Sequence, residues 1–184
     1  MFEIKYEIFE DHISRLRVID IQTFNKDYDQ IYGCFTLIVN GIEYLQFPSP
    51  EMRLETKHIF SEVILTHFEF LIEAYFELII GDYIALKYIE NPWTWLEFIR
   101  NGNSLIVNEY HHDKFCQQAL ITDREFLVNA DNRGIVNQTI TWDEFENELV
   151  RKTKELLSVI EQTNHNIIQA PCFSKIKDFS NRLS

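Results

Sequence analysis

The stretch FTLIVNGIEYLQF, residues 35–47, decides the expected fold of this chain. Asn40 and Gly41 stand between two runs of strand-forming residues, and both accept the positive φ angles that a type I′ turn requires. The stretch therefore predicts an antiparallel hairpin. Residues 2–9 alternate between apolar and polar side chains, and residues 16–24 do so less regularly, so each predicts a strand with one solvated face. The chain is expected to open with antiparallel strands and not with a βαβ unit.

Two later segments have the spacing of helices. Apolar residues recur at helical intervals through residues 51–80, and a break is expected near residues 66–67, because thirty residues at about 1.5 Å each would span roughly 45 Å. Residues 141–144, Thr-Trp-Asp-Glu, match a capping box and predict a helix over 142–162. A short final helix is expected over 174–183.

Further strands are expected between these helices, at residues 83–89, 94–99, 105–110, 121–128 and 134–140. Asn- and Gly-containing turns separate several of them. The sequence therefore predicts an α+β fold in which an antiparallel β-sheet built from hairpins is packed by a long central helix region (about 51–80) and a C-terminal helix (about 142–162). It predicts a single domain covering residues 1–184.

The composition limits the partners that the chain can have. Its 184 residues include 29 Asp and Glu against 17 Lys and Arg, a net charge of −12. Nucleic acids and anionic membrane surfaces would meet a like-charged protein, so neither is expected as a partner, whereas a basic protein is. Cys34, Cys116 and Cys172 are widely spaced and odd in number, which favours reduced thiols. Charged residues interrupt the N-terminal segment, so no signal peptide is expected and the predicted location is the cytoplasm.

The negative charge is concentrated in the middle of the sequence. Residues 51–113 contain 11 acidic and 4 basic residues, and no Lys or Arg stands between Lys57 and Lys87. The acidic residues in that interval are Glu62, Glu69, Glu73, Glu77 and Asp82. Two interpretations stay open: a solvated helix face opposite the core, or an acidic patch that binds a cationic partner in spite of its own repulsion.

An aromatic run, NPWTWLEF at residues 91–98, follows this acidic region. In a strand, Trp93, Trp95 and Glu97 would share one face. Two tryptophans beside an acidic helix resemble the anchors of a protein interface. The alternative is ordinary cross-strand packing.

No sequence motif indicates a catalytic or metal site. His58 and Glu62 lie one helical turn apart, but the chain has neither a His-Glu-x-x-His motif nor a cysteine-rich motif. Nucleophile elbows, glycine-rich phosphate loops and redox cysteine pairs are also missing from the sequence. We therefore expect a protein that is not an enzyme, with no catalytic residue, metal or cofactor.

The order of these parts resembles that of small acidic bacterial immunity proteins, which accompany polymorphic toxins. The resemblance covers roughly residues 33–163: the hairpin GCFTLIVNGIEY, the apolar and acidic helix, the strand at 83–89 with Trp93-Thr-Trp95, and the ITWDEF helix start at 140–145. It implies a cytoplasmic protein that binds a basic toxin domain, such as a nuclease, and occludes its active site. It transfers no functional residue.

The candidate partner-binding residues are Glu62, Glu69, Glu73, Glu77, Asp82, Trp93 and Trp95. Two other functions stay open. One is a self-associating structural or adaptor domain, a homodimer with the tryptophans in its interface. The other is a small-molecule-binding α+β domain that uses the concave side of its sheet.

Overall fold

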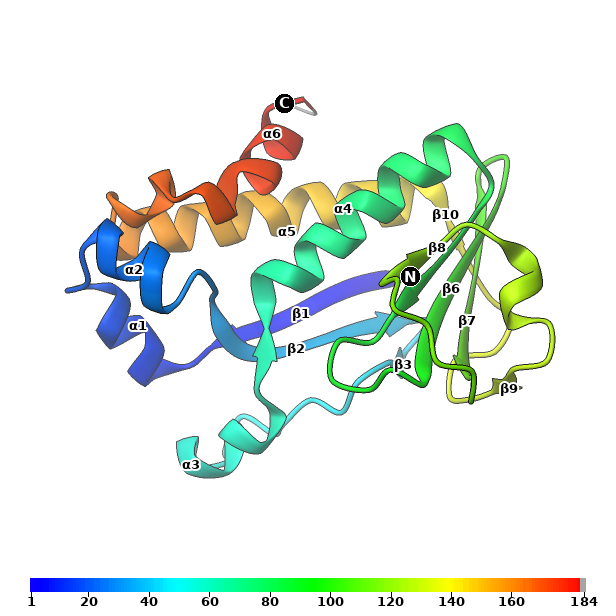
Figure 1. Ribbon diagram of the computed structural model, residues 1–184, viewed down its shortest axis with the longest axis horizontal. Helices are drawn as coiled ribbons and strands as arrows, with labels where there is room; N and C mark the ends of the chain where they lie inside the picture. Colours follow the sequence, from blue (N-terminus) through cyan, green and yellow to red (C-terminus); the bar gives the residue numbers. More distant parts are fainter. Residues whose placement is uncertain (183–184) are drawn as a thin grey trace. The chain divides into compact units, whose positions relative to one another are not determined.

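A computed structural model describes residues 1–182 (Figure 1). Antiparallel sheets and helices make up the chain, which confirms the α+β class. The chain divides into two compact units, each assembled from segments that are distant in sequence. Unit 1 comprises Met1–Glu3, Leu37–Tyr44 and Phe70–Asn147, and unit 2 comprises Ile4–Thr36, Leu45–Glu69 and the segment from Glu148 onward. The single-domain organisation stays a prediction.

The main sheet of unit 1 has the strand order β10-β7-β6-β5-β8, with β9 paired to β7, and every pairing is antiparallel (Figure 1). Its strands are β5 (Tyr83–Lys87), β6 (Thr94–Asn101), β7 (Ser104–His111), β8 (Leu120–Ile121), β9 (Asp131–Asn132) and β10 (Gln138–Thr141). The predicted strands at 83–89, 94–99 and 105–110 are confirmed. Gly102, with a φ of 60°, turns the chain between β6 and β7.

The strand expected at 121–128 is wrong, because the chain forms a short 3-10 helix there, η2 (Arg124–Leu127), directly after β8. The side chain of Asp123 accepts a hydrogen bond from the backbone N–H of Glu125 at 3.0 Å. This cap stabilises a helical turn at a position where the apolar residues alone also suit a strand.

The predicted hairpin at Asn40-Gly41 is confirmed. The φ angles are 51° at Asn40 and 85° at Gly41, and the flanking strands β2 (Tyr32–Val39) and β3 (Ile42–Glu43) pair with Val39 opposite Ile42. β3 ends earlier than expected, because the hydroxyl of Thr36 bonds the backbone of Leu45 in place of a strand ladder. β1 (Phe2–Ile8) pairs with β2 on its other side.

The strand expected over 16–24 is wrong. Two short helices occupy this part of unit 2, α1 (Glu10–Leu16) and α2 (Ile21–Asp27). Glu10 and Asp11 lie in the first turn of α1, where the helix dipole favours negative charge. Asp20 caps α2 by accepting the backbone N–H of Thr23 at 2.9 Å.

The central helical region is interrupted, as expected, but a few residues before 66–67. It consists of α3 (Leu54–Lys57), η1 (His58–Phe60), β4 (Glu62–Val63) and α4 (Ile64–Ile80). β4 pairs with the start of β2, with Gly33 opposite Glu62. A Cβ atom at Gly33 would overlap the carbonyl oxygen of Glu7, so only glycine allows the chain to pass at this distance.

The capping box is confirmed at the start of α5 (Trp142–Thr163). The carboxylate of Glu144 accepts the N–H of Thr141 at 2.8 Å, and the hydroxyl of Thr141 accepts the N–H of Glu144 at 3.1 Å. The chain continues through η3 (Ile167–Gln169) and η4 (Pro171–Phe173) into α6 (Ser174–Arg182); Leu183, the last expected residue of this helix, lies outside the described residues. None of the helices in the described part of the chain combines the length and apolar character needed to cross a bilayer.

Candidate functional site

Three of the predicted acidic residues lie near the C-terminal end of α4 in unit 1. Glu73 and Glu77 are one turn apart on the helix, and Asp82 follows it directly before β5. Two shallow concavities of about 250 and 280 Å³ adjoin this end of the helix and share Glu77 and Thr122. The structure therefore places Glu73, Glu77 and Asp82 around one hollowed surface, which we call the acidic end.

Apolar side chains accompany these carboxylates. The first concavity is lined by Phe76, Ile84 and Leu120, and the second reaches Ile80. Ile79 and Ile80 are exposed, at 51% and 85%. Exposed isoleucines beside carboxylates give the acidic end the mixture of apolar and charged groups that a protein partner can bind.

The charged residues at the C-terminal end of α4 are unfavourable for a helix. The C-terminal end of a helix carries a partial negative charge and favours Lys or Arg in the last turn. α4 has no basic residue in its last turn; Glu77 occupies that turn and Asp82 follows. Asp82 pairs with Arg124 at 2.8 Å, but both side chains are largely exposed, so solvent weakens the pair.

The other two acidic residues, Glu62 and Glu69, belong to unit 2. Glu62 is buried, and its carboxylate lies 2.8 Å from Nε2 of His67, whose ring stacks on Phe35. The expectation that Glu62 offers charge to a partner is therefore wrong, because a neighbouring side chain already pairs with it inside the fold. Glu69 is half-buried on α4.

The expectation that Trp95 anchors a partner is also wrong, because its side chain is 0% exposed. It packs edge-to-face against Phe126, with ring centroids 5.0 Å apart, and lies in a core cluster with Tyr83 and Leu127. Packing within the sheet, the alternative interpretation of the aromatic run, holds for this residue. The segment after β7 covers this face of the sheet, and its burial of Trp95 is a long-range effect that strand spacing does not reveal.

Glu97 shares the covered face with Trp95 and is buried as well. Its carboxylate accepts a hydrogen bond from the amide of Asn108 at 2.8 Å, and the Asn108 oxygen accepts the backbone N–H of Asn137 at 2.7 Å. Burial, and then the negative charge of Glu97, raise the pKa of Tyr83. These contacts fix the chain that follows β7, so Glu97 has a structural role.

Trp93 precedes β6 and is 36% exposed. Its ring lies 6.4 Å from that of Phe115, which is also exposed. Asp82 lies beside the other end of β6, because its carbonyl accepts the N–H of Arg100. Seven residue-to-residue steps along the strand lead from Trp93 to Arg100, a distance of roughly 23 Å. The acidic end and Trp93 are therefore at opposite ends of the strand.

A third concavity, in unit 2, was not predicted from the sequence. It has a volume of about 240 Å³ and is lined by Phe9, Asp11, His12, Arg15, Tyr28, Tyr32, His58 and Ser61. These residues come from three segments that are separated in sequence, and no element was predicted over residues 10–15, where α1 carries His12 and Arg15. Of the lining residues, His58 alone was a candidate from the sequence, as a metal ligand with Glu62.

Within residues 1–182, no three His, Cys, Asp or Glu side chains gather in a way that could hold a metal ion. Comparisons with protein-family models, curated proteins and solved structures give no match.

Proposed function

We propose that this chain is a cytoplasmic protein-binding module of the immunity type, which uses the acidic end of unit 1 to bind a basic toxin domain, such as a nuclease, and occlude its active site. The observation that carries the proposal is the distribution of charge. Unit 1 contains 15 acidic and 5 basic residues, so 5 − 15 gives −10 of the total net charge of −12. Unit 2 is nearly balanced.

Such a charge affects association more than it affects the final affinity. A negative surface attracts a cationic partner over a distance of about 8 to 10 Å at moderate salt, and steering of this kind raises association rates by roughly 10- to 1,000-fold. The exposed Ile79 and Ile80 would then supply apolar contact beside Glu77 and Asp82. Trp93, at the other end of β6, is a separate candidate contact.

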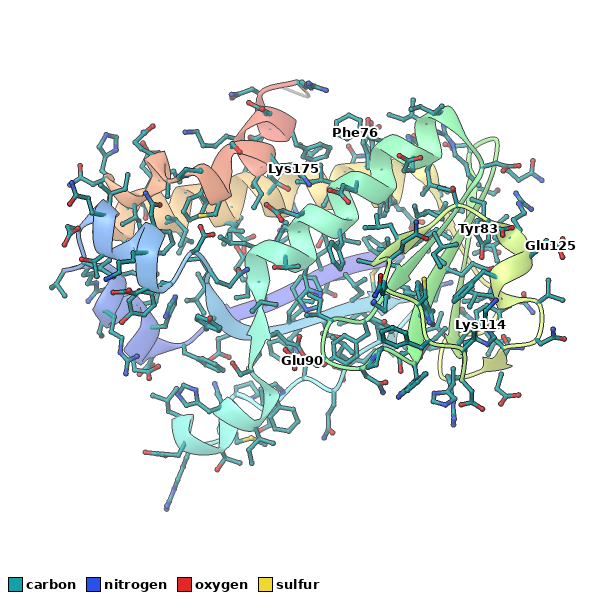
Figure 2. All side chains as sticks on the ribbon, in the orientation of Figure 1. Phe76, Tyr83, Glu90, Lys114, Glu125 and Lys175 are labelled. Carbon is teal, nitrogen blue, oxygen red and sulfur yellow. The ribbon has the colours of Figure 1, made fainter. Side chains whose placement is uncertain are left out.

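Charge reversal at the acidic end tests the proposal without disturbing the core. Glu77 and Asp82 are exposed, and the solvent-exposed ion pair of Asp82 with Arg124 contributes about 0 to 1 kcal/mol. The double variant Glu77→Lys/Asp82→Lys should therefore fold. A matched control, Glu90→Lys/Asp131→Lys, changes the net charge equally at exposed positions near Trp93, so the two variants separate the acidic end from that other candidate contact. Figure 2 labels Tyr83, which begins β5 next to Asp82, and Glu90, which lies beyond the other end of that strand.

The experiment begins with capture of partners by the tagged protein from its native host, with low-salt and high-salt washes and identification by mass. A single basic polypeptide that is lost at high salt is the expected result. Its association rate, measured at low salt, should fall about tenfold or more with the acidic-end variant and less than threefold with the control. Equal rates for the two variants would contradict a role of the acidic end. Recovery of the protein alone would favour self-association instead.

A further inference from the structure

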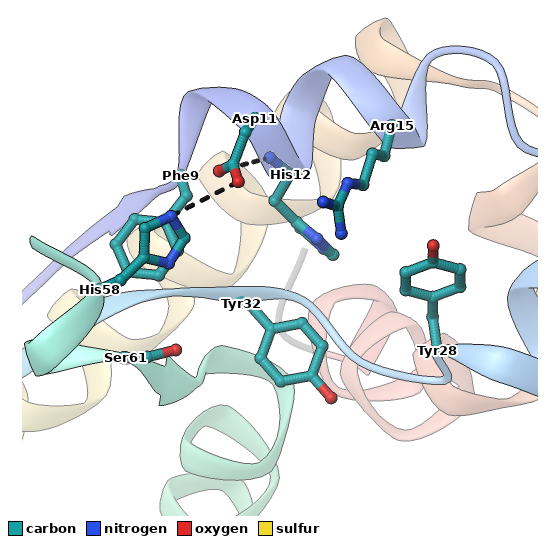
Figure 3. A pocket seen from close by; sticks show the side chains of 8 residues that line it. All are labelled: Phe9, Asp11, His12, Arg15, Tyr28, Tyr32, His58 and Ser61. Carbon is teal, nitrogen blue, oxygen red and sulfur yellow. Dashed lines mark hydrogen bonds and ion pairs between the residues drawn. The ribbon is translucent and has the colours of Figure 1, made fainter. Parts of the chain in front are cut away.

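The concavity of unit 2 has the features of a ligand site that is independent of the acidic end. Figure 3 shows its lining: α1 contributes His12 and Arg15, and the rings of Tyr28 and Tyr32 face them from below. The imidazole of His12 points into the space between the two tyrosines. A polar side chain, a cation and aromatic walls therefore converge on one hollow.

His12 is a buried polar group with one free ring nitrogen. The residue is 5% exposed, and Nε2 has no hydrogen-bond partner among the described residues. Burial lowers its pKa, against the opposing effects of Asp11 and of a hydrogen bond to the backbone of Gln30. In either tautomer of the neutral ring, Nε2 is a buried donor or acceptor without a partner, and a hydroxyl can serve it in both cases because a hydroxyl donates and accepts.

A buried polar atom without a hydrogen bond destabilises the fold, and a ligand hydroxyl that bonds Nε2 would remove this cost. Water can form a hydrogen bond with the same atom. Whether the hollow favours a ligand over water therefore depends on the other groups that line it.

Arg15 supplies a positive charge that can bind the anionic group of a ligand. No ion pair or hydrogen bond of its guanidinium group occurs in the part of the chain that the structure describes. Asp11, in contrast, is already engaged: its carboxylate accepts the N–H of His12 at 2.9 Å and lies 3.4 Å from Nε2 of His58. One guanidinium balances one carboxylate in the lining, so the hollow has no excess negative charge that would repel an anion.

We propose that this hollow binds a small organic anion that carries a hydroxyl group. Arg15 holds the carboxylate or phosphate, the ligand hydroxyl forms a hydrogen bond with Nε2 of His12, and the carbon skeleton packs against Tyr28 and Tyr32. The volume of about 240 Å³ equals the share of roughly eight water molecules in liquid, which fits three or four carbons with one charged group.

The test uses four defined probes on the whole chain. Glycerate and glycerol 3-phosphate carry both groups and represent the two sources of the anion. Propionate lacks the hydroxyl and glycerol lacks the anion. Binding is followed by NMR of the histidine rings, with the His12 signal assigned by its loss in His12→Phe.

At least one of the two hydroxylated anions should bind with a Kd below 1 mM and shift the His12 signal; glycerate alone would indicate a carboxylate ligand, and glycerol 3-phosphate alone a phosphate. Arg15→Gln should weaken binding tenfold or more. Arg17→Gln, the same charge change at the exposed end of α1, should leave binding within twofold. Because Arg15 is exposed, this variant remains informative even if His12→Phe does not fold.

Three results would overturn the proposal: no binding of either hydroxylated anion at 20 mM, equal binding of propionate or glycerol, or equal loss in Arg15→Gln and Arg17→Gln. These variants lie in unit 2, whereas those that test the proposed function lie in unit 1. Failure of one proposal therefore leaves the other standing.

Discussion

Replacing Trp95 by alanine separates a core role from a surface role for this residue. Trp95 is fully buried, and truncation of a large core aromatic costs about 3 to 5 kcal/mol. Its indole Nε1 has no hydrogen-bond partner in residues 1–182, and removing an unsatisfied buried donor returns part of that loss, so the expected cost is about 3 kcal/mol. Trp93→Ala, at a partly exposed position, should cost less than about 1 kcal/mol.

Urea denaturation followed by far-UV circular dichroism measures this difference without depending on tryptophan fluorescence. With a slope of about 2 kcal/mol per M, the Trp95→Ala midpoint should fall by roughly 1.5 M. Trp95→Phe should lose much less, because it keeps an aromatic ring beside Phe126 and removes the unsatisfied N–H. A midpoint for Trp95→Ala that falls no further than that of Trp93→Ala would refute the assignment of Trp95 to the core.

Three further measurements check other parts of the structure. Thr141→Ala removes the capping box and should cost about 1 kcal/mol in urea denaturation, whereas Thr139→Ala, at an exposed strand position, should cost much less. Burial raises the pKa of Cys34 to about 11, so at pH 8 iodoacetamide should label it, by mass spectrometry, only as fast as the protein unfolds. Burial also raises the pKa of Glu109, so the folded state binds this proton more tightly than the unfolded state does. The stability that this proton contributes is present at low pH and is lost as the pH rises through the pKa of Glu109 in the folded state. Glu109→Gln should therefore have a higher urea midpoint than wild type at pH 7. This difference in midpoint should be smaller at pH 4.

The features that could be predicted from the sequence are those decided by neighbouring residues. The hairpin turn at Asn40-Gly41 depends only on the positive φ angles of these two residues. The capping box depends only on hydrogen bonds between Thr141 and Glu144, which lie within one helical turn. The alternation of 83–89, 94–99 and 105–110 also identified the central strands. Where a local cap competes with an ambiguous pattern, as at Asp20 and Asp123, the strand prediction failed.

The candidate sites depended on contacts that are distant in sequence. Glu62 follows the same acidic pattern as Glu77, but the ring of His67 pairs with it inside the fold. Trp95 and Trp93 differ by two positions, and only the covering segment after β7 makes one a core residue. The hollow around His12 needs α1 beside residues 58–61, which no spacing rule connects.

The acidic end itself makes a final prediction, because stability and binding should change in opposite directions there. Glu77 faces the negative end of the α4 dipole and the carboxylate of Glu73 one turn earlier, each of which disfavours it by a few tenths of a kcal/mol. Glu77→Lys replaces both effects with attractions, so the isolated chain should become more stable by about 0.5 to 1 kcal/mol. The same change should slow association with a cationic partner. Selection for stability alone would favour lysine at position 77. A lower urea midpoint for Glu77→Lys than for wild type would instead show that Glu77 stabilises the fold. The presence of Glu77 at the acidic end would then be explained without a binding partner.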